Sequence, residues 1–300
     1  MEINKVLIAG SGTMGQQISF QCAISGFTTV VYDVSGESLE LCKEAHQGFA
    51  DEFVANRETS PELVAETLAR LSYSTNLPEA VVDVDLVNES ISENLNIKKS
   101  FYMELNEHCA PRTIFTTNTS TLLPSEISTS TGRPDKFLAL HFAFPVWDTR
   151  LGDVMKTPDT DDAIFERILE FAVEIGMVPI RLDKEQPGYL LNTILVPWLT
   201  AAQSLLTNEV SSAADVDKSW MLSTSMDRGP FAVMDMVGLE TIYNVFQHLG
   251  EVTQDDQVCR NAQYIKVHFL DQNKLGVKTG EGFYQYPNPL FESKNFLEAS

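Results

Sequence analysis

A glycine-rich segment close to the N-terminus has the spacing of a dinucleotide-binding turn. Gly10, Gly12 and Gly15 form the pattern G-x-G-x-x-G, in which Thr13 and Met14 precede the last glycine. The first glycine of such a turn permits a tight bend, the second lets the backbone approach a pyrophosphate, and the third lets a helix pack closely on a strand. The segment therefore predicts a dinucleotide whose phosphates lie at the start of a helix.

Asp33, which stands 23 positions after Gly10, supports the same interpretation. In dinucleotide-binding domains a carboxylate about 20 residues beyond the first glycine accepts hydrogen bonds from the adenosine ribose. Residues 34–37 contain no arginine that could bind a 2′-phosphate. We therefore expect NAD rather than NADP as the cofactor. The alternative is a structural glycine turn followed by a loop or helix-capping aspartate that binds no ligand.

The segments around the glycine turn alternate between strand and helix. Residues 6–9 form a short apolar run typical of a buried strand, residues 14–25 are amphipathic and helical, and the β-branched residues 28–32 indicate a second strand. Such a βαβ unit implies a parallel sheet. The sequence therefore predicts a Rossmann-type, doubly wound α/β sheet, with further strands at 86–89, 113–117, 137–142 and 178–182.

Two regions depart from this alternation. Residues 37–70 are helical and acidic with a break at 59–61, which indicates a helical hairpin standing off the sheet. After the proline-glycine pair at 187–188 strand signals stop and apolar positions recur at helical spacing. We therefore expect an NAD-binding Rossmann domain with a helical hairpin insertion over 1–187, and an all-helical, all-α C-terminal domain for substrate binding and dimerisation over 188–300.

The composition argues against several classes of partner. A net charge of −21 and a pI near 4.5 disfavour nucleic acid, because a phosphate backbone binds clustered Lys and Arg. No uninterrupted apolar run reaches about 18 residues and the N-terminus lacks a basic secretory start, so we expect a soluble, cytoplasmic protein without a membrane span. The cysteines form no CxxC pair and are expected to be reduced thiols outside any metal site: Cys22, Cys42, Cys109 and Cys259.

Beyond the glycine turn, several segments in the same order resemble the L-3-hydroxyacyl-CoA dehydrogenase family over nearly the whole chain. The resemblance implies NAD as the cofactor, a small acyl substrate that is a candidate CoA ester, and a homodimer formed through the C-terminal helical domain. The matching segments are 10–15 with Asp33, 92–94, 117–120, 140–142 with Pro145, 186–189 with Asn192, 228–239 and 279–286.

The resemblance implies that His141 is the general base that takes the hydroxyl proton during oxidation. An imidazole suits this task because it changes protonation state near neutral pH; the alternative is a histidine satisfied at a strand end. The family places a glutamate beside this histidine, where the present sequence has Asp153. Aspartate is one methylene shorter, roughly 1.5 Å of reach. We expect Asp153 to orient His141, with a backbone shift or a bridging water making up the missing reach; the alternative is a solvated acid.

Ser120 and Asn192 match family positions that contact the substrate oxygen and the nicotinamide region. Both side chains can donate to an oxygen that gains negative charge. Ser120 could instead cap the following helix, whereas an amide such as Asn192 on an apolar helical stretch needs a polar partner. Glu93, Lys98 and Asn118 match positions near the cofactor ribose and nicotinamide, and each could equally be an ordinary loop or helix-start residue.

Two departures from the family leave the substrate open. Ala143 and Phe144 stand where the family has a phenylalanine and then an asparagine, so the pocket gains apolar bulk and loses an amide. Residues 43–52 contain one lysine among acids, where the family has a lysine-rich helix that meets the phosphates of CoA. Each lost charge-assisted contact is worth roughly 1.5–3 kcal/mol of binding free energy. A CoA thioester should therefore bind poorly through this helix.

Three hypotheses therefore remain. The leading one is NAD-dependent oxidation of a short-chain L-3-hydroxyacyl-CoA, similar to 3-hydroxybutyryl-CoA, to the 3-ketoacyl-CoA. The second is a dehydrogenase of a free 3-hydroxy acid of the L-gulonate or carnitine type, which needs no basic patch. The third is an NAD-binding protein without catalysis, against which the retention of a histidine, a nearby acid and an amide argues.

Overall fold

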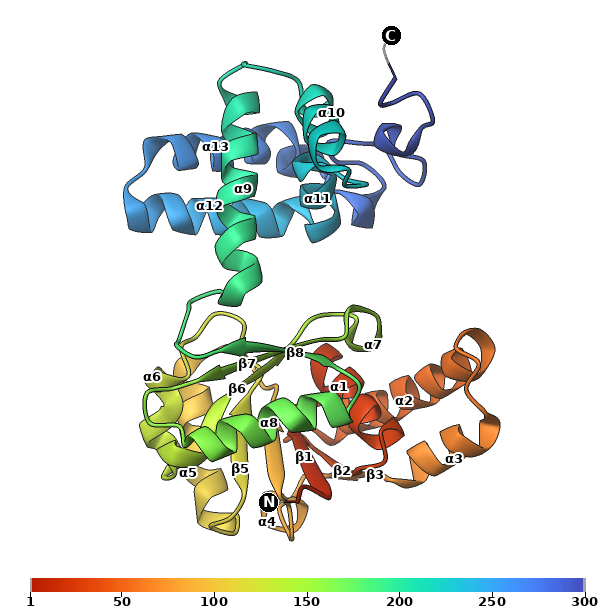
Figure 1. The fold of residues 1–300 in the computed structure, drawn as a ribbon, viewed down its shortest axis with the longest axis vertical. Helices are drawn as coiled ribbons and strands as arrows, with labels where there is room; N and C mark the ends of the chain where they lie inside the picture. The colour runs from red at the N-terminus through yellow and green to blue at the C-terminus, as the bar shows by residue number, and fades with distance from the viewer. Residues whose placement is uncertain (1, 299–300) are drawn as a thin grey trace. The chain divides into compact units, whose positions relative to one another are not determined.

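The computed structural model describes residues 2–298, which divide between Tyr189 and Leu190 into two compact units (Figure 1). The sequence placed this division two residues earlier, at the proline-glycine pair. In chain order the first unit contains β1 (Lys5–Ala9), α1 (Thr13–Ile24), β2 (Thr28–Tyr32), α2 (Gly36–Asn56), α3 (Pro61–Ala69), β3 (Leu71–Ser74), α4 (Leu77–Ala80), β4 (Leu86–Glu89), α5 (Leu95–His108), β5 (Ile114–Thr117), α6 (Ser125–Ser128), β6 (Phe137–Phe142), α7 (Val146–Thr149), β7 (Leu151–Lys156), α8 (Asp162–Glu174) and β8 (Val178–Leu182).

The strands form one eight-stranded sheet in the order β3-β2-β1-β4-β5-β6-β7-β8. Successive residues of β1 enter different cores: Val6 and Ile8 pack with α1 and α8 on one face, and Leu7 and Ala9 with α4 and α5 on the other. Burial on both faces explains why the strands are continuous apolar runs and not alternating ones. The mostly parallel, doubly wound α/β sheet predicted from the sequence is confirmed.

Two strands of this sheet were not expected from the sequence. β3 is a half-exposed edge strand of Leu, Ser, Tyr and Ser, whose composition gives little strand signal. β7 contains a glycine and an aspartate, which are both depleted in strands, and it runs antiparallel to β6. The sheet is therefore parallel from β3 to β6 and reverses direction at β7.

The helices α2 and α3, drawn in orange in Figure 1, occupy the region expected to form a helical hairpin. Buried residues of α2 recur every three or four positions, at Leu39, Cys42, His46, Ala50 and Phe53, which gives the helix one packed face. Burial lowers the pKa of His46 to about 4. This neutral imidazole thus packs within the interior of the unit and presents no charge to solvent.

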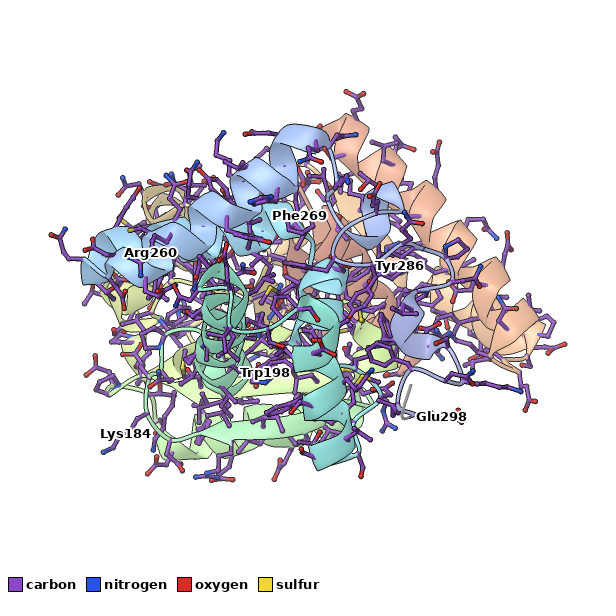
Figure 2. The ribbon with its side chains drawn as sticks, turned by 90° about the horizontal axis from the view of Figure 1, so that it is seen from above. Lys184, Trp198, Arg260, Phe269, Tyr286 and Glu298 are labelled. Carbon is purple, nitrogen blue, oxygen red and sulfur yellow. The ribbon has the colours of Figure 1, made fainter. Side chains whose placement is uncertain are left out.

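The second unit contains α9 (Tyr189–Thr207), α10 (Ala213–Thr224), α11 (Pro230–Val237), α12 (Leu239–Thr253) and α13 (Asp256–His268), which confirms the predicted helical domain. Two buried carboxylates tie its last segment down. Asp217 accepts hydrogen bonds from the Phe231 amide and the Tyr284 hydroxyl, and Asp235 accepts from the Tyr284 amide and the hydroxyl of Tyr286, which is labelled in Figure 2.

By length and composition, one helix among residues 2–298, α9, could cross a membrane, with a mean hydropathy of 1.3. Only 17% of this stretch is buried, and Leu199 and Ala202 are among its residues in the core of the second unit. A single helix of this kind is weak evidence for a membrane span.

Candidate active site

A cavity of about 780 Å³ opens at the carboxyl ends of β1, β2 and β4, where open α/β sheets bind their ligands. The glycine turn forms its floor. A Cβ added at Gly10, whose φ is +99°, would lie 2.5 Å from the Ser90 carbonyl oxygen, and one at Gly15 would lie 1.8 Å from the Gly10 carbonyl oxygen. A Cβ at Gly12 would meet nothing within 4 Å, so the turn leaves open space at the position where we expect the pyrophosphate.

The predicted residues between these glycines lie at the start of α1. Thr13 is its first residue and is exposed, while the half-buried Met14 packs against the core formed by α1 and α8. Their contacts with a cofactor stay predictions.

Asp33 follows the last residue of β2 and lines the same cavity. Its Oδ2 accepts hydrogen bonds from the Ser11 amide at 2.9 Å and the Ser11 hydroxyl at 2.8 Å, and its Oδ1 accepts from the Ser35 amide at 3.0 Å. No Lys or Arg is among the described residues that line the cavity. The cavity thus offers a carboxylate to a ribose diol and no cation to a 2′-phosphate.

We expect Asp33→Ala to narrow the difference in affinity between NAD and NADP. The substitution removes both the ribose acceptor and the charge that repels a 2′-phosphate, and the loss of the bonds to Ser11 should also weaken NAD binding. Calorimetric titration of each cofactor measures the ratio. Glu104→Ala, which removes another acid lining the cavity, is the matched control. An unchanged ratio in Asp33→Ala, or an unsubstituted protein that prefers NADP, would contradict this prediction.

His141 lies near the end of β6 between a carboxylate and a hydroxyl. Its Nδ1 is 3.1 Å from Asp153 Oδ2 and its Nε2 is 3.1 Å from Ser120 Oγ. The imidazole side chain is 14% exposed and the Asp153 side chain 4%. When the carboxylate accepts from Nδ1–H, Nε2 carries the lone pair and accepts a hydrogen bond from the Ser120 hydroxyl. This tautomer is assigned from the hydrogen-bond network, and it makes Nε2 the ring atom that can take up a proton.

The expected shortfall in the reach of Asp153 does not occur. His141 and Asp153 are directly opposite residues in the antiparallel ladder of β6 and β7. Opposite residues of such a ladder have Cβ atoms about 4.5–5.5 Å apart, which the short side chain of aspartate can bridge without a water. Asp153 therefore contacts His141 directly and needs no bridging water, because the unpredicted strand β7 places the two residues opposite each other.

Tyr189, to which the sequence assigned no role, stacks on the imidazole of His141. The ring centroids are 4.5 Å apart at an interplanar angle of 17°. The Tyr189 hydroxyl donates to the Thr119 carbonyl oxygen at 2.7 Å. Burial, followed by the charge of Asp153, raises the pKa of Tyr189, so the hydroxyl stays a donor. Gly188 and Tyr189 both adopt a positive φ, of 76° and 55°, and no pattern in the sequence indicated the stack.

Glu93 organises the turn that carries Ser120. Its Oε1 accepts hydrogen bonds from the amides of Ser120 and Thr121, both at 3.0 Å, and from the hydroxyl of Thr119. Burial acts to raise the pKa of Glu93, but the Thr119 hydroxyl, Lys98 and Thr121 outweigh it and lower the pKa to about 2. Glu93 is thus a carboxylate throughout the physiological range and anchors this turn.

Lys98 is 1% exposed and its ammonium lies between the carboxylates of Glu93 and Glu89. Glu89, which the sequence reasoning missed, is buried at the end of β4 and also accepts from the Thr117 hydroxyl. A direct contact of Lys98 or Glu93 with the cofactor stays a prediction, since both groups are engaged by neighbours.

The two predicted amides lie in different units. Asn118 follows β5, and its Oδ1 accepts a hydrogen bond from the Phe142 amide at 2.9 Å, which ties β6 down beside His141. Asn192 is exposed in the first turn of α9, within the second unit. Its role at the substrate therefore stays a prediction.

Residues 2–298 contain no group of three or more His, Cys, Asp or Glu side chains that could hold a metal ion. Three of the free cysteines are buried and Cys259 is exposed.

Comparisons with known proteins agree with this geometry. Residues 5–186 match the model of the 3-hydroxyacyl-CoA dehydrogenase NAD-binding domain, and residues 188–286 match the model of the C-terminal domain of the same enzymes. The chain belongs to the 3-hydroxyacyl-CoA dehydrogenase family. It is accordingly an oxidoreductase with an NAD-binding domain, and the hypothesis of a cofactor-binding protein without catalysis loses its support.

Relatives of this family member include the mitochondrial hydroxyacyl-coenzyme A dehydrogenase of Rattus norvegicus, which is 35% identical and covers 95% of this chain and 91% of its own. The 3-hydroxybutyryl-CoA dehydrogenase of Clostridioides difficile is 31% identical over 94% of this chain and 99% of its own. Among solved structures, a diketoreductase described for dual catalysis of dicarbonyl compounds is 41% identical, with a TM-score of 0.90 and coverage of 95% of this chain and 100% of its own.

Proposed function

We propose that this protein interconverts a short-chain L-3-hydroxyacyl-CoA, similar to 3-hydroxybutyryl-CoA, and its 3-ketoacyl-CoA, with His141 as the general base in oxidation. The observation that carries the proposal is the placement of His141 between Asp153 and Ser120 at 3.1 Å from each. The named activities of the rat and clostridial relatives support the acyl-CoA class.

The side chains of this site fit the proton transfer that the reaction needs. NAD bound in the cavity lined by the glycine turn and Asp33 would supply the acceptor for the hydride of carbon 3. His141 Nε2 takes the proton of the 3-hydroxyl group, and Ser120 Oγ, on the same side of the ring, donates a hydrogen bond to the oxygen. Asp153 accepts from Nδ1–H and stabilises the imidazolium that forms. In the reductive direction the same groups deliver the proton.

A second candidate is a substrate without CoA, such as a dicarbonyl compound or a free 3-hydroxy acid. Residues 36–70 contain eight acids and three bases, and every base is paired with an acid: Lys43 with Glu40, Arg57 with Glu52 and Asp148, and Arg70 with Glu66. No cation of the hairpin is thus left for a nucleotide phosphate. The similarity to a diketoreductase also favours this candidate.

A substrate panel distinguishes the two candidates. The panel has four compounds: acetoacetyl-CoA, the acetoacetyl thioester of N-acetylcysteamine, free acetoacetate and a simple β-diketone. The N-acetylcysteamine thioester lacks the nucleotide of CoA. Each compound is incubated with NADH, and turnover is measured as the change in nicotinamide absorbance. The proposal predicts the highest kcat/KM for the CoA ester. A compound without CoA that is turned over at least about tenfold more efficiently, a difference of about 1.4 kcal/mol in transition-state stabilisation, would establish the second candidate instead.

The sign of the salt dependence of the KM for acetoacetyl-CoA separates the two candidates. If the proposal holds, we expect this KM to rise with ionic strength, because salt screens the attraction between the CoA phosphates and basic residues. Steady-state kinetics between 20 and 300 mM salt, roughly a fourfold change in Debye length, measure the sign. The N-acetylcysteamine thioester should show no such dependence. A KM that falls as salt rises would indicate that the acidic hairpin repels CoA, would contradict the prediction and would favour the substrate without CoA.

We also infer a homodimer formed through the second unit, as the family resemblance implies. Large apolar side chains are exposed on its helices at Ile194, Leu222, Met236 and Val252, and in the turn between α9 and α10 at Val210, which supports a covered face. Light scattering after size exclusion measures the mass. A cytoplasmic location likewise stays a prediction.

A further inference from the structure

The segment 143–150, which joins the strand of His141 to the strand of Asp153, is packed against the helical hairpin by an aromatic cluster. Trp147 lies edge-on to three phenylalanine rings, with centroid distances of 4.9 Å to Phe49, 5.2 Å to Phe53 and 6.2 Å to Phe20. Phe49 and Phe53 belong to α2, and Phe20 to α1. Edge-to-face aromatic contacts are worth about 0.5–1.5 kcal/mol each beyond the area that they bury.

Arg57, at the end of α2, adds a polar contact to the same segment. Its Nη2 lies 2.6 Å from Asp148 Oδ1 and 3.4 Å from Glu52 Oε1. Its guanidinium carbon also lies 5.8 Å from the ring centroid of Trp147 and 5.1 Å from that of Phe53. The cation is thus held by carboxylates and ring faces together, which fixes its position better than an isolated surface pair does.

The segment 143–150 also contacts helix α1 and continues directly into the two strands that carry His141 and Asp153. The Val146 amide donates to Gln17 Oε1 of α1 at 2.8 Å, in a buried contact. The Thr149 hydroxyl is within 2.9 Å of the Ala143 carbonyl oxygen, which closes the segment on itself. The last pair of the β6–β7 ladder is Phe142 opposite Gly152, and the next is His141 opposite Asp153. A shift of the segment therefore reaches the catalytic pair through one intervening ladder pair.

We propose that Trp147 and Arg57 are positioning residues for the dehydrogenase reaction. Through the segment 143–150 they hold the end of the β6–β7 ladder, and so keep His141 and Asp153 at hydrogen-bonding distance. The helical hairpin is thereby part of the catalytic scaffold, whichever substrate the enzyme takes. This inference rests on the proposed role of His141 as the general base.

The test combines a measurement of position with a measurement of turnover. Trp147→Ala should increase amide hydrogen exchange in peptides spanning 138–156 and lower kcat about tenfold, since small misplacements at a reacting centre cost 10- to 100-fold. The dissociation constant for NAD should stay within about twofold, because the glycine turn and Asp33 bind it elsewhere. Trp147→Phe, which keeps an edge-on ring, should restore most of kcat, and Arg57→Ala should cause a smaller loss of the same kind.

Leu105→Ala is the matched control, because Leu105 of α5 is fully buried in the core on the other face of the sheet, which contains no residue of 138–156. It should lower the unfolding temperature while leaving kcat and exchange in 138–156 unchanged. Unchanged exchange of that peptide in Trp147→Ala would overturn the proposal, as would a loss of kcat no larger than that of Leu105→Ala. Increased exchange in Trp147→Ala, together with full turnover in His141→Ala, would support the positioning role and reject the proposed general base.

Discussion

Replacing His141 with alanine is expected to lower kcat by about 10²- to 10⁴-fold, the usual effect of removing a general base. The substitution removes Nε2, which lies 3.1 Å from Ser120 Oγ and which we propose receives the proton of the substrate hydroxyl. The affinity for NAD should change little, because the cavity in which we expect the cofactor is lined by the glycine turn and Asp33. Turnover with the best substrate of the panel and calorimetric titration of NAD measure the two quantities separately.

His108→Ala is the appropriate control, since this histidine is exposed at the end of α5. Asp153→Asn should give an intermediate loss, because it keeps the side-chain length and removes the charge that stabilises the imidazolium. If His141→Ala keeps more than half of the unsubstituted turnover, His141 is not the base and the proposed mechanism is wrong.

Gly12→Ala is expected to abolish tight NAD binding while leaving the fold intact. The added Cβ meets no protein atom within 4 Å, and Gly12 has an ordinary φ of −72°, so the folded protein tolerates it. The same Cβ occupies the space through which the pyrophosphate reaches the turn. Loss of one charge-assisted hydrogen bond is worth roughly 1.5–3 kcal/mol, so the dissociation constant for NAD should rise by at least about tenfold.

Alanine substitutions at two other glycines serve as controls for Gly12→Ala. Gly48→Ala also places a Cβ in open space, but within α2, and it should leave NAD binding unchanged. Gly15→Ala drives a Cβ to 1.8 Å from the Gly10 carbonyl oxygen, and should lower the unfolding temperature markedly. Unchanged NAD affinity in Gly12→Ala would mean that the pyrophosphate does not lie against this turn.

Local patterns in the sequence determined the cofactor half of this protein. The spacing of the three glycines, the short strand before them and Asp33 after the second strand all lie within one βαβ unit, where neighbours in sequence are also neighbours in space. The helical hairpin and the helical second unit could be predicted for the same reason, since the 3.6-residue period belongs to the helix itself and needs no partner.

The catalytic half was decided by the tertiary structure. The sequence indicated His141 and Asp153 through family resemblance, but only the antiparallel pairing of β7 with β6 places them opposite each other. The stacking of Tyr189 on His141 and the packing of Trp147 on α2 likewise join residues far apart in the chain. Such contacts depend on strand direction, ladder register and the path of connecting segments, and these are set by how whole elements pack and not by the local pattern of any one of them.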